Sequence, residues 1–302
     1  MRLAALLAAA VLLVWGCGGS SKPATTASGA PEQPPLRIGT KNFAEQFLLG
    51  ELYRQALEAK GFRVELKTNI GSSEIIHQAL TDGALDMYPE YVGVLLSEVA
   101  NVRERPESPE AAYEAAQAFE ERKGFTMLGM TPFSDANALA VTPEYAKRHN
   151  VRGIDDLRKV PGTVRIGAPP EFQTRFEGLV GLEQRYGLRN AKASAIAIGR
   201  QYAALDSGRV DAAAVFTTDG QLAGGRYVIL DDPRGVFATQ HVAPIISRAA
   251  LRERGPRLQA VIDAVSRRLT ATAMRRMNAE VQLEGRSSAG VADEFLRAQG
   301  LK

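Results

Sequence analysis

Residues 77–86 read HQALTDGALD, and residues 202–211 read YAALDSGRVD. Both stretches contain Ala-Leu, two polar residues, Gly, any residue, an aliphatic residue and Asp. In each copy a helical pattern stops at the glycine and an extended run follows, which predicts a helix that leads into a strand. When the copies are aligned, Tyr91 falls opposite Phe216, so each strand is expected to end in an aromatic residue.

The residues that flank the two copies extend the repeat to β-α-β-α-β. Strands are predicted at 36–40, 62–66 and 85–91, and again at 164–167, 193–198 and 210–216. The helices between them are predicted to begin at Asn42, with Glu45 completing a capping box, and at Gly71, and later to cover 172–186 and 202–207. This order predicts an α/β fold of two lobes, each a mainly parallel sheet flanked by helices, with a ligand cleft between them. The alternative is one doubly wound domain with an accidental repeat.

The first 35 residues differ in composition from the rest of the chain. Residues 1–16 join Arg2 to an uncharged apolar run, which is typical of a signal peptide and too short to span a bilayer. Residues 14–17 read VWGC and resemble a bacterial lipobox, so Cys17 is expected to carry a lipid. Residues 17–35 are rich in Gly, Ser, Thr, Ala and Pro and predict a flexible tether. The sequence thus predicts an exported, lipid-anchored protein.

Composition and motifs argue against several classes of function. The net charge of +3 is small for 302 residues, and the C-terminal arginines alternate with apolar residues at helical spacing, which favours a solvated helix face over nucleic-acid binding. The three histidines are far apart without metal-ligand spacing, and the single cysteine excludes an intrachain disulfide. Asp86 and Asp211 could form an acid/base pair, but their repetition at strand starts favours bonds to the backbone. We therefore expect no metal, no cofactor and no catalysis.

Three stretches carry a resemblance to a known family. Residues 38–46 read IGTKNFAEQ, residues 86–93 read DMYPEYVG, and residues 216–220 read FTTDG. They resemble the substrate-binding proteins of glycine betaine/carnitine/choline (osmoprotectant, quaternary amine) ABC transporters. The resemblance implies a periplasmic-binding-protein-like fold hinged by two crossing segments. Lobe one would comprise 36–136 plus 241–302, and lobe two 137–240.

The resemblance also implies how such a protein works. The chain would be a non-enzymatic receptor outside the cytoplasmic membrane. It would capture a small zwitterionic or cationic solute and dock on a permease that is driven by a cytoplasmic ATPase.

Family members hold quaternary ammonium groups in a cage of tyrosines, and this cage is incomplete here. Tyr91 matches one cage position, whereas the other three positions hold Asn137, Phe216 and Gln240. The resemblance further places Lys41, Asn42 and Arg175 near a ligand carboxylate or the seam between the lobes. The predicted ligand-binding residues are Lys41, Asn42, Tyr91, Asn137, Arg175, Phe216, Thr218, Asp219 and Gln240.

The two amides in the cage bear on the identity of the ligand. Replacing two aromatic faces would cost a trimethylammonium group about 1–4 kcal/mol. Amides offer donors and acceptors to a ligand that has N–H or O–H groups. We therefore expect weak binding of quaternary amines, or a different ligand such as an amino acid or another polar zwitterion. An exported α/β enzyme remains a further alternative.

Overall fold

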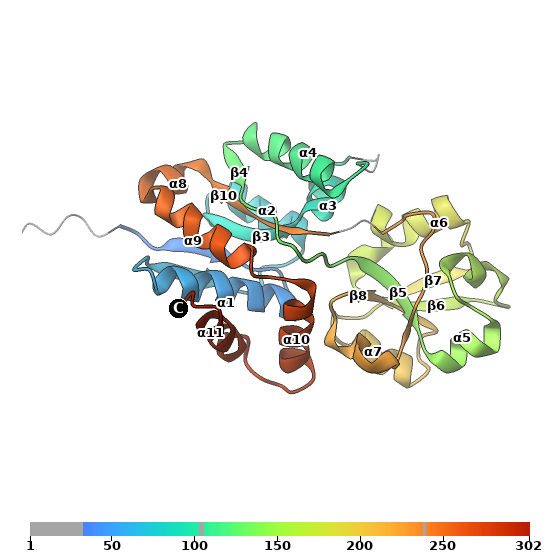
Figure 1. The fold of residues 1–302 in the computed structure, drawn as a ribbon. Helices are drawn as coiled ribbons and strands as arrows, with labels where there is room; N and C mark the ends of the chain where they lie inside the picture. Colours follow the sequence, from blue (N-terminus) through green and yellow to red (C-terminus); the bar gives the residue numbers. More distant parts are fainter. Residues whose placement is uncertain (1–32, 103–105, 238–239) are drawn as a thin grey trace, which may run out of the picture. The chain divides into compact units, whose positions relative to one another are not determined.

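The two copies of the repeat form the centres of two five-stranded sheets (Figure 1). The computed structural model describes residues 33–102, 106–237 and 240–302, so the predicted signal peptide, Cys17 and nearly all of the tether lie outside the described residues. The first sheet has the strand order β2-β1-β3-β10-β4, and the second has the order β7-β6-β8-β5-β9. The two orders correspond strand for strand, which confirms the doubled β-α-β-α-β plan.

Each sheet is mixed rather than fully parallel. In the first sheet β1 runs parallel to β2 and β3, whereas β10 runs antiparallel to β3 and β4. The second sheet repeats this pattern, with β6 parallel to β7 and β8, and β5 antiparallel to β8 and β9. The first sheet contains β1 (Leu36–Gly39), β2 (Val64–Lys67), β3 (Met87–Tyr91), β4 (Phe125–Met127) and β10 (Val242–Ser247). The second contains β5 (Asn137–Val141), β6 (Val164–Ala168), β7 (Ala191–Ala195), β8 (Ala212–Phe216) and β9 (Val228–Ile229).

Helices cover both faces of each sheet. One face of the first sheet packs on α1 and the C-terminal helices, and its other face packs on α2 and α4 (Figure 1). We call this sheet and its helices the first lobe; they are α1 (Ala44–Glu58), α2 (Ser73–Thr81), α3 (Val92–Val94), α4 (Pro109–Glu121), α8 (Arg248–Arg254), α9 (Pro256–Ser266), α10 (Ala271–Gln282) and α11 (Ser288–Ala298). The second lobe is the second sheet with α5 (Pro143–His149), α6 (Gly181–Tyr186) and α7 (Gln201–Asp206). Because both faces are covered, the central strands are mostly buried, as the burial of all five residues of β3 shows.

Two local predictions about helices were wrong. The first residue before α1 is Phe43, and neither Asn42 nor Glu45 makes the predicted capping bonds. Glu45 is instead drawn to partners in the core, described below. The helix predicted over 172–186 is broken into short turns before α6, because Glu177 and Gly178 have non-helical dihedral angles.

The two crossing segments, from β4 to β5 and from β9 to β10, bond to each other. Ser134 and His241 form an isolated antiparallel bridge. The Asp135 N–H donates to the Gln240 carbonyl oxygen over 2.8 Å, and the Gln240 N–H donates to Ser134 Oγ over 2.8 Å. Residues from the two segments therefore reach the region between the sheets as a pair.

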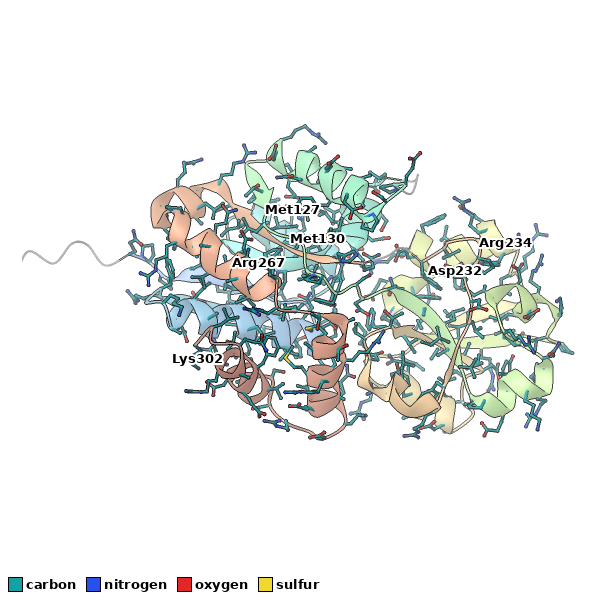
Figure 2. All side chains as sticks on the ribbon, viewed as in Figure 1. Met127, Met130, Asp232, Arg234, Arg267 and Lys302 are labelled. Atoms are coloured by element: carbon teal, nitrogen blue, oxygen red, sulfur yellow. The ribbon has the colours of Figure 1, made fainter. Side chains whose placement is uncertain are left out.

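The crossing segment from β9 to β10 is also bonded to the second lobe. The Tyr186 hydroxyl donates to Asp232 and accepts from the Arg234 N–H, and the Arg234 guanidinium pairs with Asp155 at 2.7 Å. Figure 2 shows Asp232 and Arg234 on this segment. Within the described ranges, no helix has the length and apolar character needed to cross a bilayer.

Candidate functional site

Residues of both lobes and of the crossing segments line one pocket. Its volume is about 820 Å³, which includes space open to solvent. Tyr91 at the end of β3 and Phe216 at the end of β8 both contribute, as the repeat predicted for the carboxyl ends of the strands. Seven of the nine predicted residues line it: Lys41, Asn42, Tyr91, Asn137, Arg175, Phe216 and Gln240.

Three aromatic rings form a stack in the pocket wall. The Phe43 ring lies between Tyr91, at a centroid distance of 6.0 Å, and Phe216, at 5.1 Å. The interplanar angles of 27° and 17° make both contacts stacked. Phe43 was not predicted as a site residue, although it stands inside the family-like stretch 38–46. Phe43 thus joins the two expected rings in one aromatic cluster.

Lys41 is buried against this stack and carries its own counter-ion. Its Nζ lies 2.6 Å from Glu90 Oε1 and 3.1 Å from Ser73 Oγ. The same Nζ lies 4.2 Å from the centroid of the Tyr91 ring, within the range of a cation–π contact. Burial lowers the pKa of the Lys41 ammonium, and the Glu90 carboxylate opposes that shift. The pair explains why two charged side chains occur below the surface here.

The two amides of the incomplete cage are bound to a buried carboxylate. Asn137 Nδ2 donates to Glu177 Oε2 over 2.7 Å, and Gln240 Nε2 donates to both Glu177 oxygens over 3.0 and 3.1 Å. Glu177 lines the pocket and is only 7% exposed. It reaches this place because the backbone is non-helical at Glu177 and Gly178. Only glycine fits at position 178, since a Cβ atom there would lie 2.1 Å from the Phe172 carbonyl oxygen. Gly178 is the sequence signal for this break, whereas the pattern over 172–186 predicts a regular helix.

Arg175 links the second lobe to the first. Its guanidinium pairs with Glu74 at 2.7 Å and with Glu98 at 3.4 Å. Glu74 belongs to the first turn of α2, and Glu98 to the turn Leu95–Val99. The guanidinium thus lies in the seam between the lobes, one of the two places implied by the resemblance.

Thr218 and Asp219 lie behind the pocket lining, in a buried network. Thr218 Oγ1 donates to Glu45 Oε2 over 2.6 Å, and that carboxylate also accepts from the Tyr91 hydroxyl over 2.7 Å and from Asn278 Nδ2 over 2.7 Å. Asp219 accepts from the Tyr202 hydroxyl over 2.7 Å. Burial raises the pKa of Glu45, and the three donated bonds oppose the rise.

This network joins the lobes through α10. The Gly220 N–H donates to Gln282 over 2.8 Å, and a Cβ on Gly220 would lie 2.6 Å from the Ala279 Cα. A larger residue at Gly220 would therefore displace the loop from the helix. Thr218 and Asp219 hold the end of β8, and with it Phe216, at a fixed place relative to α1 and α10.

The arrangement is that of a binding site for a small charged molecule. Its lining brings together aromatic rings, a lysine, an arginine and several carboxylates. One of these, Asp135, is buried, and burial together with the neighbouring Glu45 and Asp219 raises its pKa well above the usual range.

Comparisons with known proteins agree with this arrangement. Residues 34–298 match the family model described as the substrate-binding domain of ABC-type glycine betaine transport systems. The glycine-betaine-binding protein of Pseudomonas aeruginosa is 30% identical over 286 residues, which cover 91% of each chain. The glycine betaine-binding protein YehZ of Escherichia coli is 28% identical, over 88% of this chain and 91% of its own.

Solved structures give the same result. The crystal structure of a glycine betaine/carnitine/choline ABC transporter protein superposes with a TM-score of 0.70 and 26% identity, over 88% of this chain and 99% of that chain. The family match covers almost the whole of the described chain and accounts for both sheets and the pocket. The chain therefore belongs to the substrate-binding proteins of ABC-type glycine betaine transport systems, and it is an extracytoplasmic binding protein rather than an enzyme.

Proposed function

We propose that this protein captures a small zwitterionic or cationic solute whose cationic group carries N–H donors, and that it binds fully methylated ammonium groups weakly. The observation that carries the proposal is the Glu177 carboxylate, which lines the pocket and is held there by Asn137 and Gln240. A buried carboxylate attracts any cation, but only an N–H group can also donate a hydrogen bond to it.

The state of the aromatic rings supports the same proposal. Phe43 already stacks on Tyr91 and on Phe216, and Lys41 Nζ already lies over Tyr91. Fewer ring faces remain for a trimethylammonium group, which depends on them because it donates no strong hydrogen bond. The weak binding expected from the missing tyrosines thus gains a second physical reason.

The negative end of a zwitterion has suitable partners in the same pocket. Ser72 and Ser73 line it at the N-terminus of α2, where backbone N–H groups favour an anion. The Lys41 ammonium is bonded to Ser73, and Arg175 pairs with Glu74 in the next position of that helix. We place the ligand carboxylate here.

Stepwise removal of methyl groups from one ligand tests the proposal. Calorimetry with glycine betaine, dimethylglycine, sarcosine and glycine varies the number of N–H groups from none to three on a constant carboxylate. We expect affinity to rise by about tenfold or more from glycine betaine to the best N–H-bearing member, because a hydrogen bond to a charged group contributes about 1.5–3 kcal/mol. A micromolar or lower dissociation constant for glycine betaine would contradict the proposal.

A matched pair of variants assigns the preference to Glu177. Glu177→Gln should remove most of the discrimination between glycine betaine and the N–H-bearing ligands. Glu171→Gln neutralises another carboxylate of the lining and should keep the discrimination. Equal effects of the two variants would show that the net charge of the pocket, and not the bonds to Glu177, sets the preference.

Export and anchoring complete the proposed function. A signal peptide at 1–16, a lipid on Cys17 and a tether over 17–35 would hold the binding protein close to its permease and ATPase. Replacing Cys17 by Ser should release the protein from the membrane fraction, and continued membrane association would contradict lipid anchoring.

A further inference from the structure

The C-terminal helices carry a concentrated positive charge. Residues 248–276, which span α8, α9 and the start of α10, contain eight arginines, no lysine and two acidic residues. The net charge of this stretch is therefore +6, whereas that of the whole chain is +3. The rest of the chain is thus slightly acidic, and the excess of positive charge lies in one part of the fold.

Five of these arginines are exposed and unpaired. α9 buries its apolar side against the core of the first lobe, and its opposite side presents arginines. No ion pair or side-chain hydrogen bond joins any described residue to the five, which we call the basic face: Arg252, Arg257, Arg267, Arg268 and Arg275. The two acidic residues have other partners, since Asp263 accepts from the Gly129 N–H over 2.9 Å and Glu253 lies 3.4 Å from Arg254.

The neighbouring helices do not show this excess. In α1, Arg54 pairs with Glu51 at 2.5 Å and with Glu58 at 2.6 Å, and in α11 Arg297 pairs with Asp293 at 2.7 Å. On the other face of the first sheet, α4 contains four glutamates and no lysine or arginine. The first lobe thus has a basic side and an acidic side, so an anionic surface would orient it.

The predicted tether joins the body on the basic side. Arg254 Nη2 donates to the Pro34 carbonyl oxygen over 2.9 Å, and α8 and α9 lie next to each other on the first lobe (Figure 1). Cys17 precedes Pro34 by 17 residues, and a flexible chain of that length spans about 20–25 Å. A lipid on Cys17 would therefore keep the basic face within reach of the bilayer.

We propose that the basic face docks the first lobe on the anionic lipid headgroups of the membrane that holds the anchor. This inference rests on the lipid anchor of the proposed function. Arginine suits a phosphate headgroup, because its planar guanidinium donates two parallel hydrogen bonds to one phosphate. Among the described residues, none after Gln240 lines the pocket, so this docking leaves the pocket open to the solute.

Cosedimentation with lipid vesicles tests the docking. The protein is the chain from residue 17 on with Cys17→Ser, which contains the whole compact unit 34–302 and no lipid, so that its binding reports the basic face. Vesicles of equal parts phosphatidylglycerol and phosphatidylcholine are compared with vesicles of phosphatidylcholine alone. We expect binding to the anionic vesicles only, with release at high salt, because salt screens exposed charges. Equal binding to both vesicles, or binding to neither, overturns the inference.

A matched pair of triple variants assigns the binding to the basic face. Arg257→Gln, Arg267→Gln and Arg268→Gln together should weaken binding to the anionic vesicles at least tenfold, since each arginine near such a surface contributes about fivefold. The control makes the same change of net charge at three exposed residues of the second lobe and should bind almost as the unmodified chain does: Lys147→Gln, Arg148→Gln and Lys192→Gln. Equal losses in the two variants would show that net charge alone matters and would overturn the inference.

Three further measurements separate this inference from its alternatives. The triple variant of the basic face should bind the N-methyl series as the unmodified chain does, so the ligand preference and the docking fail independently. Membrane fractions washed at high salt keep a lipid anchor and lose the contact of the basic face, so Cys17→Ser reports anchoring alone there. A chain that ignores the vesicles but is retained on immobilised polyglutamate through the three arginines has an acidic protein segment as its partner, and this outcome also overturns the inference.

Discussion

The two lobes contain the same pair of an aspartate and an arginine, which we call the clasp, but they contribute different side chains to the pocket. In the first lobe Asp86 accepts from the Arg37 N–H over 2.8 Å and from its guanidinium over 2.7 Å. In the second lobe Asp211 accepts from the Arg165 N–H over 2.8 Å and from its guanidinium over 2.7 Å. In both, the arginine also donates to the carbonyl of the glycine that ends the preceding helix. Each clasp thus joins the first strand of its repeat to the third.

The lobes differ where the third strand ends. The Tyr91 hydroxyl donates to Glu45, and the Tyr91 ring contacts the Lys41 ammonium. Phe216 has no hydroxyl, and its ring stacks on Phe43. Positions that the repeat shares hold the strands together, and positions that it does not share line the pocket. The comparison therefore separates residues that stabilise the fold from residues that we propose select the solute.

The largest expected effect is on the pH dependence of stability, and it concerns a position of the repeat that holds a histidine in the first lobe and a tyrosine in the second. His77 aligns with Tyr202, and His77 contacts Glu120 at 3.8 Å and Tyr88 at 3.2 Å. Burial, with Lys123 assisting, lowers the pKa of His77 to about 4, and burial raises the pKa of Glu120 to about 7. The folded state therefore holds more protons on Glu120 than the unfolded chain between about pH 4.5 and 7, so that contribution to stability falls as pH rises.

The shift of His77 has the opposite sign, since folding expels its proton, and its contribution rises between about pH 4 and 6.5. Glu120→Gln should thus gain stability relative to the unmodified chain as pH rises from 4.5 to 7, by up to about 3 kcal/mol. His77→Gln should lose stability relative to the unmodified chain as pH rises from about 4 to 6.5. Urea unfolding at several pH values measures both differences. Glu121→Gln, an exposed carboxylate on the same helix, is the control, and a Glu120→Gln profile parallel to it would refute the prediction.

Much of the fold could be predicted because the helices and strands of the repeat follow from local hydrophobic spacing and from the positions of glycines. The glycines that end helices have the expected positive φ, as at Gly61 and Gly187. The prediction that Asp86 and Asp211 bond the backbone is confirmed, but their arginine partners lie 49 and 46 residues away. Such pairs depend on tertiary contact, and no local pattern shows them.

The site could be predicted in part for the same reason. The family-like motifs contained the residues at the ends of the strands, and these residues do line one pocket. Glu177 and Phe43 were missed because their roles arise from a break in a helix and from the approach of separate rings. Glu45 was expected to cap α1, but three donors from distant segments hold it instead. Competition of this kind between local and tertiary partners cannot be resolved from sequence spacing.

The next largest effect compares the two clasps directly. Asp86→Ala should cost about 2 kcal/mol of unfolding free energy and Asp211→Ala about 1 kcal/mol, because each loses a hydrogen-bonded ion pair and the second is more exposed to solvent. The side chain of Arg37 is 34% exposed and that of Arg165 is 48% exposed. Urea unfolding of the single variants and the double variant measures the costs, which should add because the clasps share no residue. A larger cost at Asp211 would contradict the ranking.

The smallest effect separates the ring of Tyr91 from its hydroxyl. Tyr91→Phe gives the first lobe the same side chain as Phe216, and it should cost about 1 kcal/mol of stability because the Glu45 carboxylate loses one of its donors. Ligand affinity should change less than about twofold, since the hydroxyl is bonded inside the protein and the ring stays in place. Tyr91→Leu removes the ring as well and serves as the comparison, with a clear loss of affinity expected. If Tyr91→Phe weakens ligand binding as strongly as Tyr91→Leu, the hydroxyl contacts the solute, and Tyr91 is not the internally bonded counterpart of Phe216.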